Sequence, residues 1–253
     1  MIRLKTPTEV EEIRRSAGLV ADTLEYLGPH VQPGVTTREL DRLAEAFIRQ
    51  HGGVPSFLGY RGYRYSICAS VNDEVVHGLP GPRALKEGDV ISIDVGVYRN
   101  GFHGDAARTF PVGPIRLDAQ KLLDVTRESL MLGVAQVKSG ARLGDVSAAI
   151  QAHAEHHGFS VVRSLVGHGI GRDLHEDPQI PNFGRAGVGV VLKTGMVLAI
   201  EPLVNAGGWE VETLEDGWTV VSADSSLAAH FEHTVAVTED GPDILSLPTT
   251  RGR

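Results

Sequence analysis

The sequence predicts an α+β fold in which two similar halves, each with two helices followed by strands, surround a mainly antiparallel curved sheet. Paired helical patterns return about 106 positions apart, and the strand that follows Gly88 resembles the strand that follows Gly195. A two-residue hairpin signal, Asn100-Gly101, lies between long strand-like segments. We expect one domain over 1–253, duplicated over about 1–112 and 113–245 around a pseudo-twofold axis, with 246–253 as a loose tail.

Two helices are predicted in the first fifty residues. Thr6-Pro7-Thr8-Glu9 combines an N-cap, a proline at the first helical position and a capping-box glutamate. A second capping box begins at Thr36, and Gly52-Gly53 ends the helix that follows it. Apolar residues recur at helical spacing in both segments, which predicts one buried face for each helix.

The second half repeats this layout. Asp118 is interpreted as the N-cap of a helix that runs towards Val137, and a further helix is expected from about Leu143 to Gly158. Chance similarity between two helix-helix-strand segments is the alternative explanation. Matching acids at the ends of the repeated strands, Asp94 and Glu201, favour duplication.

Asp94 lies in an unusual place for a carboxylate. The run Val90–Val97 is apolar on both faces, so it predicts an interior strand in which an unpaired carboxylate costs several kcal/mol. If Asn100-Gly101 forms the turn, Gly96 faces Asp105, and Asp94 becomes the diagonal neighbour of Asp105 on the same face, about 7–8 Å away. Such a pair can hold one metal ion or bridge two, whereas a one-residue shift in register would separate it.

Two further acids, Glu201 and Glu232, are predicted on strands, and His168 lies between glycines that allow close backbone approach. Each acid alone is more often salt-bridged than a ligand, but four acids in apolar settings need a common explanation. Four carboxylates carry −4, which two divalent cations neutralise. Oxygen donors with one imidazole and no thiolate favour Mn, Fe, Co or Zn in a catalytic site. Phosphate binding by the glycine-rich run Val166–Gly171 is the weaker alternative, because no Lys-Ser/Thr pair follows it.

The composition excludes some classes of protein. The chain has 24 Lys+Arg against 32 Asp+Glu, a formal net charge of −8, and no basic block, so sequence-specific nucleic-acid binding is not expected. No apolar run approaches the roughly 20 residues of a membrane span, and the N-terminus lacks the apolar core of a secretory signal. With Cys68 as the single cysteine, no internal disulfide is possible. We therefore expect a cytoplasmic protein without a membrane partner.

Several motifs occur in the order and spacing of a known family. The chain from Met1 to about Thr238 resembles the type I methionine aminopeptidases, the smallest pita-bread metallopeptidases. The matching segments are Ser70–Gly78, Ile93-Asp94-Val95, Gly101–Asp105, Gly167–Gly171, Leu174–Pro178, Ile200-Glu201-Pro202 and Phe231–Thr234. The resemblance implies a pita-bread fold and a single catalytic domain. It also implies removal of the initiator methionine from nascent proteins and peptides whose second residue is small.

The resemblance also implies roles for matched residues. Two divalent metal ions (Co, Mn, Fe or Zn) would be held by Asp94, Asp105, His168, Glu201 and Glu232, with Asp105 and Glu232 bridging them. Glu201 would also accept a proton from a metal-bridging water as this attacks the scissile carbonyl. His77 and His175 would contact the substrate, His175 at the developing oxyanion and His77 at the scissile nitrogen.

The methionine pocket is implied by the same comparison. Tyr60, Tyr63, Cys68 and Trp218 match its walls, whereas Phe57 and Leu174 replace a frequent cysteine and a frequent aromatic residue. Without the resemblance, the aromatic residues are interpreted as part of the buried core, His77 as a core histidine and His175 as a loop residue. Cys68 is expected in the pocket wall, since no base has a predictable position beside it. The histidines at 103, 230 and 233 are interpreted as edge residues or as residues behind the ligands.

Two rivals remain at this point. An Xaa-Pro aminopeptidase or dipeptidase of the same fold usually carries an additional N-terminal domain, and this chain starts at the catalytic repeat. A non-catalytic binding protein that kept the fold would have lost metal ligands. The expected partners are nascent polypeptide N-termini at the ribosome, and the protein is expected to be a monomer.

Overall fold

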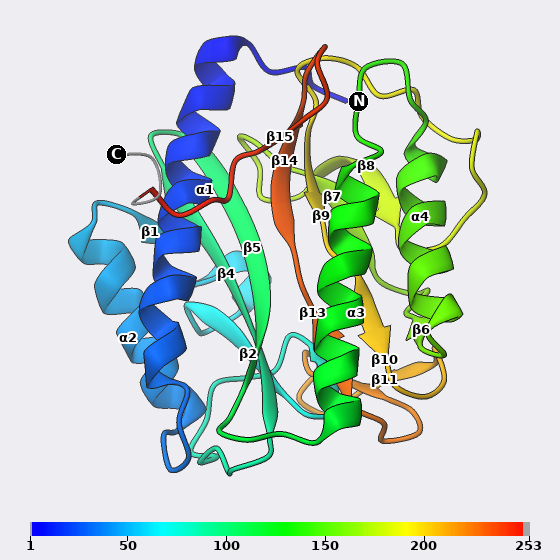
Figure 1. The fold of residues 1–253 in the computed structure, drawn as a ribbon. Coiled ribbons are helices and arrows are strands. Elements are labelled where there is room, and N and C mark those ends of the chain that lie inside the picture. The colour runs from blue at the N-terminus through cyan, green and yellow to red at the C-terminus, as the bar shows by residue number, and fades with distance from the viewer. Residues whose placement is uncertain (1, 250–253) are drawn as a thin grey trace.

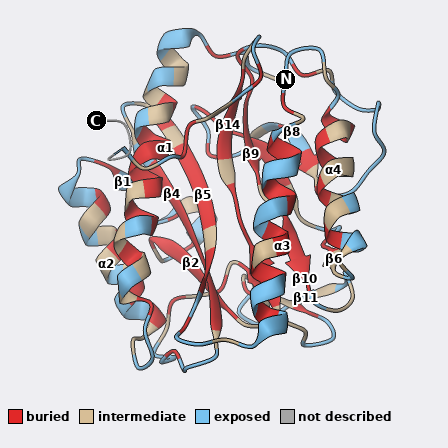
Figure 2. Cartoon of the chain, in the orientation of Figure 1, coloured by how far each residue is buried: buried red, intermediate tan, exposed pale blue. Residues whose placement is uncertain are grey.

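Helices lie on one side of the molecule and antiparallel strands lie behind them (Figure 1). The computed structural model describes residues 2–249. Its helices are α1 (Pro7–Leu27), η1 (Gly28–His30), α2 (Thr37–Gln50), η2 (Tyr60–Gly62), α3 (Leu117–Val134) and α4 (Leu143–His156), of which η1 and η2 are short 3-10 turns. The long helices turn their buried faces towards the strands and expose the opposite faces (Figure 2), as their periodicity predicts. None of the helices in the described part of the chain is long and apolar enough to cross a membrane.

The strands pair antiparallel throughout the described sheets. They are β1 (Val54–Pro55), β2 (Ile67–Val71), β3 (Glu74–Val76), β4 (Val90–Arg99), β5 (Phe102–Pro111), β6 (Ser160–Val161), β7 (Val166–Gly169), β8 (Glu176–Pro181), β9 (Val197–Ile200), β10 (Leu203–Asn205), β11 (Val211–Thr213), β12 (Val220–Ser222), β13 (Ala228–His230), β14 (His233–Val237) and β15 (Pro242–Ile244). The first half contributes the sheet β1-β4-β2 with β5 beside β4, and the second contributes β15-β14-β9-β7-β8. The α+β architecture expected from the sequence is confirmed.

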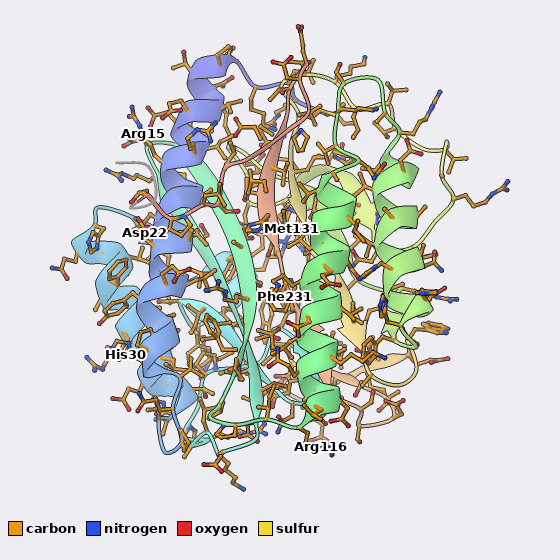
Figure 3. All side chains as sticks on the ribbon, in the orientation of Figure 1. Arg15, Asp22, His30, Arg116, Met131 and Phe231 are labelled. Atoms are coloured by element: carbon orange, nitrogen blue, oxygen red, sulfur yellow. The ribbon has the colours of Figure 1, made fainter. Side chains whose placement is uncertain are left out.

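Helix termini follow the predicted caps in most cases. The Thr6–Glu9 capping box is complete. At α2 only one half of the predicted box is formed, in which the Thr36 side chain accepts the backbone N–H of Glu39. The prediction that Asp118 caps α3 is wrong, because the cap position belongs to Arg116 (Figure 3) and Asp118 lies in the first turn. The Asp118 carboxylate instead pairs with the Arg116 guanidinium and accepts the N–H of Ala119.

The hairpin between β4 and β5 has the predicted register. Arg99 pairs with Phe102 and Gly96 pairs with Asp105, with Asn100 and Gly101 both at positive φ in the turn. The first eight residues of β4 are buried, as expected for an interior strand. Asp94 and Asp105 are therefore diagonal neighbours on one face of the hairpin.

Each half has its own hydrophobic core, and a third cluster joins the two. One core gathers residues from α1, α2, β2, β4 and β5, and the other is built mainly from α3, α4 and the strands of the second half. The joining cluster includes Ala17 and Phe102 from the first half with Ala199 and Ala236 from the second. It lies beside the seam where β5 meets β14.

Side-chain hydroxyls and backbone groups hold that seam together. Thr234 Oγ1 donates to the carbonyl of Asp105 at 2.7 Å and accepts the Asp105 N–H at 3.1 Å. The N–H of Glu232 donates to the carbonyl of Ala107 at 3.0 Å. These contacts are cross-links between the halves, and they place Asp105 next to Glu232.

The expected loose tail is held in place as far as it is described. Ser246 is buried, and its Oγ accepts the N–H of Thr234. Thr249 donates its N–H and its hydroxyl to Asp22 on α1. The prediction is thus wrong for residues 246–249, whereas 250–253 lie outside the described residues.

The packing of α1 on β5 predicts a strong effect of a single methyl group. A Cβ at Gly104 would lie 2.3 Å from the backbone nitrogen of Ala17, so Gly104→Ala must push helix and strand apart. We expect a loss of about 2–3 kcal/mol in the free energy of unfolding, measured by urea denaturation. At Gly81 the nearest atom is 3.7 Å from the added Cβ, so Gly81→Ala should stay within about 0.5 kcal/mol of the parent protein. Equal stability of the two variants would contradict this account of the packing.

Candidate metal centre and substrate pocket

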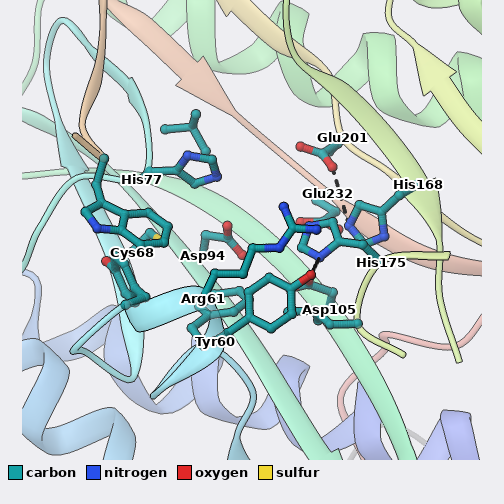
Figure 4. Close-up of a pocket in the computed structure, with 15 residues that line it drawn as sticks. Tyr60, Arg61, Cys68, His77, Asp94, Asp105, His168, His175, Glu201 and Glu232 are labelled. Atoms are coloured by element: carbon teal, nitrogen blue, oxygen red, sulfur yellow. Dashed lines mark hydrogen bonds and ion pairs between the residues drawn. The ribbon is translucent and has the colours of Figure 1, made fainter. Parts of the chain in front are cut away.

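The residues predicted for the site line one pocket of about 150 Å³ (Figure 4). The predicted residues at its wall are Tyr60, Tyr63, Cys68, His77, Asp94, Asp105, His168, His175, Glu201, Trp218 and Glu232. They come from both halves of the chain. The pocket also includes Phe57, Arg61, Val76 and Leu174.

Two of the four acids lie within strands, and the other two lie next to strand ends. Asp94 and Asp105 lie within β4 and β5, as predicted. Glu201 and Glu232 lie just outside the strands on which they were expected, directly after β9 and directly before β14. Because His233 pairs with Ile200, continuation of that register places Glu201 opposite Glu232. The seam at β5 then brings the two pairs of acids together.

Burial makes these carboxylates difficult to ionise in the absence of bound cations. Burial raises the pKa of Asp94 to about 7. Burial, followed by the charges of neighbouring acids, raises the pKa of Asp105, Glu201 and Glu232 well above their ordinary values. Within the described residues, one carboxylate oxygen each of Asp94, Asp105 and Glu232 has no hydrogen-bond partner. Such groups require a bound cation or a proton.

His168 has the orientation of a metal ligand. Its Nδ1 is 2.9 Å from the carbonyl of Gly169, which can only accept, so Nδ1 carries the ring proton. Nε2 then presents a lone pair to the acids, 3.7 Å from Glu201 Oε1. Burial lowers the pKa of His168 to about 4, which keeps the ring neutral. A backbone carbonyl behind the ring is the usual arrangement for a ligating histidine.

The geometry therefore fits a divalent cation. Ligand atoms of Asp105, His168 and Glu232 all lie within 4.8 Å of one another, and all three residues are buried. Asp94 and Glu201 line the same pocket beside them. No lysine or thiolate among the described pocket residues competes for these acids: Cys68 is buried beside Asp94, and burial raises the pKa of its thiol.

His230 is a neighbour of the acids whose position the sequence analysis assigned only loosely. Its ring is 1% exposed, and Nε2 lies 3.8 Å from Glu201 Oε2 and 3.9 Å from Glu232 Oε2. Burial lowers its pKa to about 3, so it is neutral. The two-residue spacing between His230 and Glu232 could have predicted this contact, because it places both side chains on one side of an extended segment.

His77 and His175, the other two histidines that line the pocket, lie on opposite sides of it (Figure 4). His175 Nδ1 is 2.9 Å from the hydroxyl of Tyr60, and the two rings stack with centroids 5.2 Å apart. Burial, and then the neighbouring His168, lower the pKa of His175 to about 3. His77 adopts a positive φ of 59° and packs edge-on against Trp218, and burial also lowers its pKa. Both rings can thus act as neutral hydrogen-bond donors near pH 7.

Apart from Arg61, the rest of the pocket wall is mainly aromatic and aliphatic. Trp218 packs edge-on against Tyr63, whose hydroxyl donates to the carbonyl of Ile67. Phe57 and Leu174, where the sequence departs from the family pattern, are both buried in the same hydrophobic cluster and line the pocket. The departures therefore preserve an apolar wall and alter its shape.

Buried carboxylates with one imidazole are the donors that catalytic divalent cations take in hydrolases. The fold and this donor set define the class as a metallohydrolase. Residues 11–239 match metallopeptidase family M24, and the chain belongs to this family.

Relatives of known name agree with this assignment. The chain is 57% identical over 246 residues to methionine aminopeptidase 1 of Bacillus subtilis, which covers 97% of this chain and 99% of that protein. The crystal structure of methionine aminopeptidase from Thermotoga maritima is 49% identical, with a TM-score of 0.96 over 98% of this chain and 100% of that one. An Xaa-Pro dipeptidase from Bacillus anthracis shares only the fold, at 22% identity and a TM-score of 0.78.

The buried acids predict an unusual pH dependence of stability. Because folding raises their pKa values, the folded chain binds more protons than the unfolded chain above about pH 4, and stability falls as pH rises. The buried histidines act in the opposite direction, since their lowered pKa values remove stability only below about pH 6.5. Protein treated with EDTA should therefore lose several degrees of Tm between about pH 6.5 and 8.

Calorimetry with and without Mn²⁺ checks this. Cations that bind the ionised acids should abolish the decline. Asp105→Asn, which removes one acid, should show a smaller decline with EDTA and a weaker response to Mn²⁺. A Tm of the EDTA-treated protein that does not change above pH 6.5 would show that the acids ionise freely.

Proposed function

We propose that this protein is a methionine aminopeptidase that removes the initiator methionine from nascent chains and peptides with a small second residue. The observation that carries the proposal is the placement of the buried acids and His168 in the same pocket as an apolar wall of Tyr63, Trp218 and Leu174. Such a pocket can accept an apolar side chain while the acid cluster faces the adjoining amino end. The relatives of the chain support the same activity.

Two divalent ions are the proposed cofactor, with Mn, Fe, Co and Zn as the candidates. Asp94, Asp105, His168, Glu201 and Glu232 would hold them, because four carboxylates match the charge of two such ions. When bound, the ions would supply Lewis acidity and lower the pKa of a coordinated water. Divalent metal use itself agrees with membership of a metallopeptidase family.

The residues of the chain would then perform the proton transfers and orient the substrate. Glu201 lies at the acid cluster and would take a proton from the attacking water and return it to the leaving amine. When the Tyr60 hydroxyl donates to Nδ1 of His175, Nε2 carries the ring proton and can donate to the developing oxyanion. His77, held on the other side of the pocket, would contact the scissile nitrogen. The buried thiol of Cys68 stays protonated and would serve only as pocket wall.

We further propose one catalytic domain that works as a cytoplasmic monomer on nascent chains at the ribosome. The cluster that joins the two cores supports a single domain. A single cysteine agrees with a reducing compartment.

Peptide hydrolysis tests the activity directly. We expect cleavage of Met-Ala-Ser and Met-Gly peptides, loss of cleavage with EDTA, and recovery when Mn²⁺ or Co²⁺ is added. An Ala-Pro peptide is the control, since an enzyme specific for Xaa-Pro bonds would prefer it. Binding of no metal, with no cleavage of any peptide, would favour a non-catalytic protein that kept the fold.

The histidine roles have a separate test. His77→Ala and His175→Ala should bind metal as the parent protein does, yet lose about 10²–10³ in kcat, because each removes one donor at the reacting bond. Isothermal titration with Mn²⁺ and steady-state kinetics give both quantities. His153→Ala, on α4 and outside the pocket, is the control. Full activity of either pocket variant would exclude its assigned role.

A further inference from the structure

Arg61 is a charged residue of the pocket that has no role in the proposed chemistry. Arg61 is the only lysine or arginine among the described pocket residues, and it lies at the exposed end of the pocket, whereas Asp94, Asp105 and Glu232 are buried at the other. In Figure 4 its side chain extends past Tyr60 towards His175. A peptide whose amino end is held at the acid cluster would extend towards the end of the pocket where Arg61 and His175 are exposed.

The backbone holds Arg61 in a strained conformation. Its φ of 48° and ψ of 26° lie in the left-handed region, which a residue with a side chain occupies at a cost. Gly59 and Gly62, both at positive φ, flank it, and the N–H of Gly59 donates to the carbonyl of Tyr63 at 2.7 Å to close the loop. The strain is retained in a loop that forms part of the pocket wall, where it sets the point at which the arginine side chain leaves the backbone.

The guanidinium is oriented yet lacks a counter-ion. Its central carbon lies 5.3 Å from the centre of the Tyr60 ring, and the Tyr60 hydroxyl is hydrogen-bonded to His175. Among residues 2–249, no carboxylate forms an ion pair with Arg61, whereas arginines such as Arg14, Arg83 and Arg108 each have one. Since bound cations would neutralise the buried acids, Arg61 would remain as the unbalanced positive charge at the pocket mouth.

We propose that Arg61 forms a subsite for a substrate carboxylate on the carboxyl-terminal side of the scissile bond. A planar guanidinium binds a carboxylate with two parallel hydrogen bonds, and the Tyr60 ring behind it restricts its orientation. The carboxylate is an acidic side chain at the third residue or the free carboxyl-terminus of a short peptide. This inference rests on the proposed aminopeptidase activity and adds a preference to it.

Four tripeptides separate the two sources. Met-Ala-Gln-amide is neutral after its second residue, Met-Ala-Glu-amide adds a side-chain carboxylate, Met-Ala-Gln with a free carboxyl-terminus adds a terminal one, and Met-Ala-Lys-amide adds a positive charge. The parent enzyme should cleave at least one carboxylate peptide with a kcat/KM about three- to fivefold above the neutral peptide, as expected for a partly exposed ion pair. Raising the salt concentration from about 0.05 to 0.5 M should reduce that ratio.

Variants of Arg61 provide the decisive comparison. Arg61→Ala should bring the ratio close to one, and Arg61→Glu should reverse it in favour of the lysine peptide. Arg64→Ala removes an exposed arginine three residues away that does not line the pocket, and it should keep the parent ratio. The ratio is independent of the amount of folded enzyme, so partial unfolding of a variant does not obscure it.

Each other outcome overturns the inference. An unchanged ratio in Arg61→Ala, or a parent enzyme that does not distinguish the peptides, excludes the subsite while leaving the aminopeptidase activity intact. An equal loss of kcat on all four peptides would show that Arg61 acts through His175 and does not bind the substrate. Failure of the parent enzyme to cleave any of the four would refute the proposed function as well.

Discussion

Mutual repulsion among buried carboxylates is the constraint on which this structure depends. Asp94, Asp105, Glu201 and Glu232 are largely shielded from bulk water, and each raises the cost of ionising another. A lysine or arginine in their midst would have satisfied them, but no such residue is described at the buried end of the pocket. Unpaired buried charges are among the most costly features a fold can contain. The chain therefore retains an arrangement that becomes favourable when divalent cations bind.

The position of the acids on the seam between the halves extends that constraint to the whole fold. Asp94 and Asp105 belong to the first half, whereas Glu201 and Glu232 belong to the second. The hydrogen bonds of Thr234 to Asp105 and of Glu232 to Ala107 fix the distance between the two sets. A cation shared by Asp105 and Glu232 would link the halves at the same place. Metal binding would thus stabilise the observed placement of the two halves.

Local rules predicted the parts of the site that are encoded within a single hairpin. The turn at Asn100-Gly101 fixes the register of β4 and β5, and the two-residue period of a strand then places Asp94 beside Asp105. Asp118 was misassigned because a nearby arginine offers it an alternative partner, which a capping rule does not weigh. The neighbours of His230 depend on the junction of strands far apart in sequence, and no local pattern describes that junction. The placement of Arg61 in the pocket wall likewise depends on a loop with a strained backbone.

Three described residues other than glycine and asparagine adopt positive φ, and two of them, Arg61 and His77, lie in the pocket wall, whereas Ser225 does not. Asn72 and Asn100 adopt positive φ in turns, as asparagine commonly does, but His77 and Arg61 do so at the pocket wall, with φ of 59° and 48°. The residue after His77 is a glycine whose added Cβ would lie 2.5 Å from the carbonyl oxygen of Ala69, so the backbone beside His77 packs directly against β2 and has room only for glycine. Strain of this kind persists only where surrounding contacts over-determine it. In the proposed function, a backbone whose strain is already overcome in folding would hold both residues at the pocket wall before a peptide enters, which lowers the entropic cost of orienting the substrate.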